Sequence, residues 1–212
     1  MIRHKFYLAS TSPRRQELLA GMGIPFSVLS PGDDESVESN VSPQEMVRLL
    51  SKRKALAGVQ MIDGDIPSVV LGADTVVAID DHILGKPIDA DDARRMLKLL
   101  SGRTHSVFTG VALAVAASNG APSTCFITVM ETKVTFRVML PALIETYVAT
   151  REPLDKAGGY GIQGGGSVFV IELLGDYFNV VGLPVSKVAA MLEQCGFDWW
   201  NPDCWLEGAS SG

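Results

Sequence analysis

Hydroxyl and guanidinium groups gather in the segment Ser10-Thr11-Ser12-Pro13-Arg14-Arg15, at the expected start of a helix. Ser12 suits an N-cap and Pro13 the first helical position, and the apolar residues that follow predict a helix ending at Gly23. Free N–H groups at a helix N-terminus attract anions, and two arginines add forked donors suited to phosphate. The segment indicates a phosphate site, unless the arginines only extend into water or pair with acids.

Carboxylates form a second group of candidates. Asp74, in Gly72-Ala73-Asp74-Thr75, follows an apolar run over residues 68–71, and we place it at the carboxyl end of a strand, where α/β proteins bind ligands. There it could hold a metal ion or take a proton from water. Glu35, in an acidic loop, could supply a second oxygen ligand for a divalent cation. The alternative for Asp74 is a turn aspartate that hydrogen-bonds to its own backbone, and the alternative for Glu35 is a loop that is simply solvated.

Two lysines and a glycine-rich stretch complete the candidates. Lys54 and Lys86, the latter in Leu84-Gly85-Lys86-Pro87, could neutralise phosphate charge, although most lysines are simply solvated. The stretch over residues 155–166 lacks P-loop spacing, which argues against kinase-like ATP binding. Its one amide, Gln163, can both donate and accept hydrogen bonds, as the edge of uracil or thymine requires. The alternative is a flexible loop between a helix and a strand.

The elements that must position these residues alternate between strands and helices. Short apolar runs, a hairpin pattern around residues 80–82 and helices with proline near their starts predict an α/β fold. Because hairpins accompany the alternating elements, a mixed sheet is expected rather than a purely parallel one.

Composition narrows the class of protein. The 212 residues suit one domain, or two lobes sharing a core, which we place at residues 1–196. Residues 197–212 are expected to be a disordered terminus or in part a cloning remnant. The net charge of −6 argues against a binder of nucleic acid polymers, and the three scattered cysteines suggest neither a disulfide framework nor a zinc site. No transmembrane helix or signal peptide is expected, so a cytoplasmic, membrane-free protein is predicted.

Taken in order, six segments resemble the Maf family of nucleotide pyrophosphatases. The resemblance covers about residues 5–195, and YGIQG is typical of the branch that prefers dTTP and UTP. The matching segments are LASTSPRR at 8–15, GADTVV at 72–77, GKP at 85–87, LSGRTHSVFTGVAL at 100–113, EPLDKAGGYGIQG at 152–164 and NVVGLP at 179–184.

The resemblance implies an elongated, two-lobed α/β fold similar to inosine triphosphate pyrophosphatases. Its long mixed β-sheet would be flanked by helices, with the active site in a cleft between the lobes. It also implies a divalent metal cation (Mg²⁺, Mn²⁺ or Co²⁺) and a homodimer. One departure from relatives is Gly164-Gly165-Gly166, where a larger residue is common, so a more mobile loop is expected here.

The resemblance also assigns roles by motif position. Asp74 matches the general base, and Arg14, Thr75 and Gln163 match positions associated with substrate specificity. The other residues expected in the cleft are Ser10, Arg15, Glu35, Lys54 and Lys86. In the resulting hypothesis, Asp74 and Glu35 hold the metal, Asp74 activates water, and Lys86 with the other cations neutralises phosphate charge. The competing hypothesis is a nucleotide-binding regulator linked to septum formation, with little catalysis.

Overall fold

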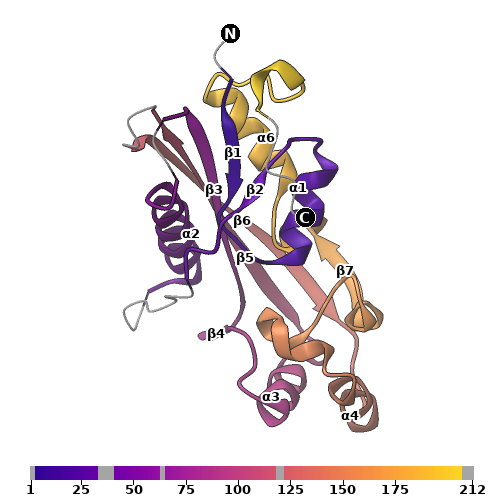
Figure 1. Cartoon of the computed structure of the whole chain (residues 1–212). Coiled ribbons are helices and arrows are strands. Elements are labelled where there is room, and N and C mark those ends of the chain that lie inside the picture. The colour runs from indigo at the N-terminus through magenta and orange to yellow at the C-terminus, as the bar shows by residue number, and fades with distance from the viewer. Residues whose placement is uncertain (1–2, 33–40, 63–64, 118–121, 207–212) are drawn as a thin grey trace. The chain divides into compact units, whose positions relative to one another are not determined.

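The computed structural model describes residues 3–32, 41–62, 65–117 and 122–206. Within these residues seven strands form one mixed sheet in the order β2-β1-β3-β5-β6-β7, with β4 paired to β3 (Figure 1). Strand β1 runs parallel to β2 and β3, whereas the pairs β3–β4 and β6–β7 are antiparallel. The strands are β1 (Lys5–Leu8), β2 (Ser27–Val28), β3 (Ser68–Ile79), β4 (His82–Leu84), β5 (Thr104–Ala116), β6 (Pro122–Phe136) and β7 (Val170–Leu174).

Helices alternate with the strands along the chain, so the predicted α/β class with a mixed sheet is confirmed. They are α1 (Pro13–Gly21), α2 (Pro43–Val59), α3 (Ala90–Leu100), α4 (Pro141–Ala149), α5 (Tyr177–Val181) and α6 (Val185–Gln194). Three short 3₁₀ helices lie between α4 and β7: η1 (Glu152–Asp155), η2 (Ala157–Gly159) and η3 (Gly165–Phe169). A fourth, η4 (Pro202–Cys204), lies near the end of the described residues.

The chain divides into two compact units. The first comprises residues 1–74, 110–129 and 182–212, and the second comprises residues 75–109 and 130–181. Three boundaries between the units fall inside β3, β5 and β6, and the fourth follows α5.

In the first unit helices cover both faces of the sheet, with α2 on one side and α1 and α6 on the other (Figure 1). Successive residues of a strand point to opposite faces, and β3 is apolar on both. Leu71 packs in the cluster that contains Leu19 of α1 and Leu192 of α6. Val70 packs in the cluster that contains Ala55 and Val59 of α2. This burial explains why β3 shows no alternation of polar and apolar residues.

Two glycines allow α2 to lie directly against the sheet. A Cβ at Gly72 would lie 2.4 Å from the carbonyl oxygen of Ser51 and 2.5 Å from the backbone nitrogen of Ala55. A Cβ at Gly110 of β5 would lie 2.2 Å from the carbonyl oxygen of Val47. Because these contacts involve helix backbone, no side-chain movement could relieve them. The glycines therefore set how closely α2, which carries Lys54, approaches β3.

The second unit has its own apolar core, built from α3, α4 and the aromatic residues around them. His105, Phe136 and Tyr160 meet edge to face, with ring centroids 4.7–5.4 Å apart. The buried Tyr160 hydroxyl lies 2.9 Å from Nε2 of His105. The second ring nitrogen of His105, Nδ1, is buried and has no partner among the described residues.

Residues 197–206, which follow α6, pack into the apolar core of the first unit. Trp205 is 3% exposed; it stacks on Phe197 and meets the ring of Phe6 edge to face. His4 pairs with Trp205 in a parallel bridge: its N–H donates to the Cys204 carbonyl at 2.9 Å, and its carbonyl accepts from Leu206 at 2.9 Å. Trp200, by contrast, is 75% exposed.

Ser42 caps α2: its hydroxyl accepts from the Glu45 N–H at 3.2 Å, and the Glu45 side chain pairs with Arg48. Of the local predictions, the hairpin is confirmed and the strand end at Asp74 is wrong. The hairpin turn falls at residues 80–81, since Ile79 pairs with His82. Asp74, however, does not end a strand, because β3 continues to Ile79 on apolar residues that a second core buries.

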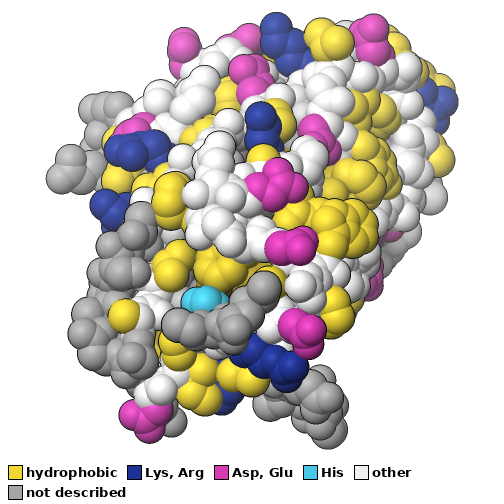
Figure 2. Space-filling model, turned by 90° about the horizontal axis from the view of Figure 1, so that it is seen from above, with side chains coloured by type: hydrophobic (Ala, Val, Ile, Leu, Met, Phe, Trp, Pro, Cys, Tyr) yellow, Lys and Arg dark blue, Asp and Glu magenta, His cyan; other side chains and the backbone are white. Residues whose placement is uncertain are grey.

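Three further observations bear on the composition. In Figure 2, acidic and basic side chains are interspersed with apolar ones on the face that is seen. The described cysteines Cys125, Cys195 and Cys204 are all free thiols. Across the described ranges, no helix combines the length and apolar character needed to span a bilayer.

Candidate functional site

Ser10 and Arg15 form one polar contact of the first unit. Ser10 follows β1 and is 8% exposed, and its hydroxyl accepts from the Ser12 N–H and from Nη1 of Arg15, both at 3.3 Å. The Nε of Arg15 donates to the carbonyl oxygen of Gly182 at 2.9 Å. Arg15 therefore ties the end of β1 to the segment that precedes α6, and part of its forked donor set is used within the protein.

The start of α1 has the geometry that the sequence predicts. Ser12 occupies the N-cap position with an extended backbone, and Pro13 opens the helix. In the described chain the Ser12 side chain makes no capping hydrogen bond, and the first turn contains no acidic residue. Arg14 lies in this first turn, where the helix dipole opposes a cation and favours an anion. The arrangement suits a phosphate group.

Lys54 and Asp74 form an ion pair in the first unit. The Lys54 ammonium lies 2.6 Å from Oδ1 of Asp74, and the two side chains are 14% and 9% exposed. Asp74 lies two residues beyond Gly72 and so projects from the same face of β3, toward α2, which carries Lys54. Among the described residues Lys54 is the one polar partner that Asp74 has.

These two contacts lie at the same end of the first unit. Strands β1 and β3 run parallel with Leu8 beside Leu71, and the Ala9 N–H donates to the Leu71 carbonyl at 2.8 Å. Ser10 and Asp74 follow these paired residues in the same direction along the chain. Asp74 thus lies inside its own strand, β3, but beyond the point where the neighbouring strand β1 ends. Its carboxylate is therefore placed next to the C-terminal end of β1.

Thr75 belongs to a polar chain in the second unit. Its hydroxyl lies 2.9 Å from that of Thr109, which donates to the backbone carbonyl of Asn179 at 2.9 Å. The fully buried Asn179 amide donates to the Val107 carbonyl at 3.0 Å and to the Thr132 hydroxyl at 2.9 Å. The side chain of Thr109 therefore links the Thr75 hydroxyl to the backbone of Asn179.

Lys86 and Gln163 are exposed in the second unit and make no hydrogen bond to the described residues. Lys86 follows β4, and the carbonyl of the preceding Gly85 accepts from the Gly158 N–H at 3.0 Å. Gln163 lies in a turn that the Gly164 N–H closes onto the Gly161 carbonyl at 3.2 Å. Both side chains are accessible to a ligand.

The predicted acidic ligand Glu35 lies outside the described residues. Within the described ranges, no group of three or more His, Cys, Asp or Glu side chains is placed to hold a metal ion. The Asp74 carboxylate is nevertheless the hard oxygen donor that Mg²⁺ or Mn²⁺ prefers.

No sequence pattern marks Thr109, Asn179, Glu152 or Tyr147 as individual site residues. All four lie in or beside segments whose role becomes visible only in space, since their partners are five to 72 residues away. A buried asparagine in an apolar stretch, as in residues 179–184, is the one signal that could have indicated such a network.

A model of the Maf-like protein family matches residues 5–195. The chain belongs to the Maf-like family. Among curated members, the dTTP/UTP pyrophosphatase of Moorella thermoacetica is 50% identical over 197 residues, which cover 93% of this chain and 98% of that protein. The dTTP/UTP pyrophosphatase of Bacillus cytotoxicus is 47% identical over 191 residues, covering 90% and 95%.

A solved structure of a HAM1 protein from Coxiella burnetii is also similar, with a TM-score of 0.45 and 11% identity over 90% of this chain and 99% of that one.

Proposed function

We propose that this chain is a nucleoside triphosphate pyrophosphatase that hydrolyses dTTP and UTP to the monophosphate and pyrophosphate. One observation carries the proposal: a nearly buried carboxylate, Asp74, is paired with Lys54 at the end of the first unit where Ser10 and Arg15 also meet. The full-length similarity to two proteins named dTTP/UTP pyrophosphatase supports the choice of substrate.

In the proposed reaction, a water molecule attacks the α-phosphorus. The bond from the water oxygen to phosphorus forms, the bond to the bridging oxygen breaks, and pyrophosphate leaves. Asp74 takes the proton of the water, and the contact with Lys54 holds the carboxylate in place. Arg14, Arg15, Lys54 and Lys86 would neutralise the charge that the phosphates carry and develop.

A divalent cation (Mg²⁺, Mn²⁺ or Co²⁺) would be held by Asp74 together with Glu35. When bound, it supplies Lewis-acid stabilisation of phosphate oxygens and lowers the pKa of bound water. Asp74 fits this role in donor type, and the Lys54 contact engages only one of its two oxygens.

Base selection is assigned to Gln163, with Thr75 and Arg14 as further specificity positions. A pyrimidine such as uracil or thymine offers carbonyl acceptors beside an N–H donor, and a single amide can answer both. The exposed position of Gln163 leaves its amide available for this contact. The homodimer that the family resemblance implies stays a prediction, and light scattering of the purified protein tests it. The cytoplasmic location expected from the sequence also stays a prediction.

The test is a panel of canonical and modified triphosphates, assayed for monophosphate and pyrophosphate with Mg²⁺, Mn²⁺ and Co²⁺. Asp74→Asn should lower turnover of dTTP and UTP by about 10²–10⁴-fold, the usual contribution of a general base. Asp81→Asn, an exposed hairpin residue, is the matched control and should be silent. Near-normal turnover by Asp74→Asn would refute the assignment, and a purine triphosphate clearly outcompeting both pyrimidines would refute the role of Gln163.

The same assay separates the alternative of a nucleotide-binding regulator. A protein that binds dTTP in calorimetry but releases no pyrophosphate with any of the three metals would favour the regulator.

A further inference from the structure

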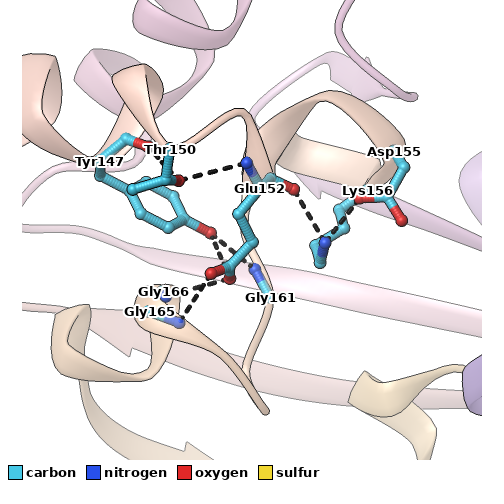
Figure 3. A network of polar contacts seen from close by, with 8 residues as sticks. All are labelled: Tyr147, Thr150, Glu152, Asp155, Lys156, Gly161, Gly165 and Gly166. Carbon is cyan, nitrogen blue, oxygen red and sulfur yellow. Dashed lines mark hydrogen bonds and ion pairs between the residues drawn. The ribbon is translucent and has the colours of Figure 1, made fainter.

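The carboxylate of Glu152 lies at the centre of a polar network in the second unit (Figure 3). Its Oε1 accepts from the Tyr147 hydroxyl at 2.9 Å and from the Gly166 N–H at 3.4 Å, and its Oε2 accepts from the Gly165 N–H at 2.9 Å. One side chain thus collects a hydroxyl from α4 and two backbone donors from the glycine-rich segment.

The network holds the chain on both sides of Gln163. Tyr147, besides donating to Glu152, accepts from the Gly161 N–H at 3.1 Å through the same oxygen. Gly161 lies two residues before Gln163, and Gly165 lies two residues after it. Figure 3 shows the contacts of Gly161 with Tyr147 and of Gly165 with Glu152. The turn that contains Gln163 is therefore held at its start through Tyr147 and at its end through Glu152.

The glycines in this segment lie close to the side chains of Glu152 and Tyr147, so a larger residue would displace the network. A Cβ at Gly164 would lie 2.4 Å from Oε1 of Glu152, and one at Gly166 would lie 2.8 Å from the Tyr147 hydroxyl. None of Gly161, Gly164, Gly165 or Gly166 has a positive φ, so close approach explains them better than an unusual backbone conformation. The structure ties Gly165 and Gly166 to a carboxylate, and the more mobile loop expected from the sequence stays a prediction.

Charge strengthens the network. Partial burial acts to raise the pKa of Glu152, but the donors Gly165, Tyr147 and Gly166 and the charge of Lys156 together hold that pKa below its usual range. Glu152 is thus an ionised, acceptor-only group at neutral pH, and hydrogen bonds to an ionised acceptor are stronger than neutral ones. Lys156 also donates to the Glu152 carbonyl at 2.8 Å, which fixes the backbone from which the carboxylate projects.

We infer that Glu152 is a positioning residue for base selection: it holds Gly165 directly and Gly161 through Tyr147, and so fixes the placement of the Gln163 amide. The inference rests on the proposed role of Gln163 in pyrimidine recognition. Glu152 has no role in the chemical step. Loss of the network should therefore change the contribution of the base to binding more than it changes turnover.

The experiment compares kcat and KM for dTTP and dGTP in the wild type, Glu152→Gln and Tyr147→Phe. Glutamine keeps the size of the side chain but places an amide donor against donors. We expect the ratio of kcat/KM for dTTP to that for dGTP to fall about tenfold, mostly through KM for dTTP, since one displaced hydrogen bond is worth about that factor. Glu145 lies on the same helix as Tyr147 and forms an exposed ion pair with Arg94. The control variant Glu145→Gln removes this ion pair and should leave the ratio unchanged.

If the role of Glu152 is purely structural, Glu152→Gln should lower the melting temperature but leave this ratio unchanged when it is measured well below that temperature. That outcome would overturn the inference. Tyr147→Phe provides the same comparison if Glu152→Gln does not fold. Gln163→Ala tests the proposed role of Gln163 separately from the role inferred for Glu152. If it abolishes pyrimidine preference while Glu152→Gln and Tyr147→Phe keep it, the inference fails and the proposed function stands; if Gln163→Ala itself keeps the preference, the proposed base recognition fails.

Discussion

The ammonium of Lys54 lies 2.6 Å from Oδ1 of Asp74, and both side chains are almost buried. A pair of this kind is costly to break one partner at a time, because the remaining charge stays desolvated. The pair also gives the carboxylate a fixed orientation toward the end of the first unit where Ser10 lies. In the proposed mechanism, stability and catalysis would therefore depend on the same contact.

The first prediction concerns the coupling between these two residues. If Lys54 acts on the reaction mainly by orienting Asp74, then Lys54→Met and Asp74→Asn should not be additive in kcat. The double variant should be about as slow as Asp74→Asn alone. Steady-state kinetics with dTTP on all four proteins of the cycle measures the coupling. Fully multiplicative losses would show that Lys54 acts independently, for example on phosphate alone.

The second prediction concerns the approach of α2 to β3. Gly72→Ala places a methyl group against the helix backbone at Ser51 and Ala55, so α2 must shift and carry Lys54 with it. We expect a loss of about 1–3 kcal/mol in the free energy of unfolding, as for other overpacked cores, together with a fall in kcat. Urea denaturation and the dTTP assay measure the two effects.

Gly21→Ala is the control for this substitution. Gly21 is the last residue of α1, and a Cβ there would have no neighbour within 4 Å. Alanine at this position should be neutral or stabilise the protein slightly, because it restricts the unfolded chain without a clash. Equal behaviour of the two variants would mean that the close approach at Gly72 has no energetic consequence.

The third prediction concerns the residues that follow α6. Trp205 is buried against Phe6 and Phe197, whereas Trp200 is mostly exposed on a stack with Trp199. Trp205→Ala should lower the free energy of unfolding by about 3–5 kcal/mol, the usual cost of truncating a buried aromatic residue. Trp200→Ala should cost little. Chemical denaturation of both variants decides, and a silent Trp205→Ala would show that this segment is not part of the folded core.

How much the sequence could predict depended on whether the signal was local. The Ser42 cap and the hairpin at residues 80–81 are set by neighbouring residues, and both were predictable. The continuation of β3 through Asp74 was not predictable. Gly72 is typical of a turn when it is considered by sequence alone, whereas its actual role is to leave room for the backbone of α2. The Glu152 network was also hidden, since a carboxylate that accepts from residues 13 and 14 positions away leaves no periodic pattern.

The same limit applies within the candidate site. Ser10 and Arg15 lie five residues apart, and helix-start chemistry predicted their neighbourhood. The contact of Lys54 with Asp74 spans 20 residues and follows from the close approach of α2, which only the packed structure reveals.

The fourth prediction concerns pH and His105. Burial lowers the pKa of His105 to about 4, from an ordinary value of 6.5. The unfolded chain therefore binds a proton as the pH falls through about 6.5, while the folded chain does not until about pH 4. The free energy of unfolding therefore falls progressively as the pH drops through that window. The loss is absent well above pH 6.5 and complete below about pH 4. Between pH 7 and pH 5 the free energy of unfolding should fall by about 2 kcal/mol from this residue alone.

Urea denaturation at several pH values between 5 and 7 measures this slope. Carboxylates with lowered pKa values, such as Glu152, begin to matter only below about pH 4.5, so they do not obscure it. His105→Gln keeps a polar partner for the Tyr160 hydroxyl but cannot take up a proton in this range, and it should flatten the pH dependence. If the variant and the wild type lose stability in parallel from pH 7 to pH 5, then His105 is not held neutral by the core of the second unit.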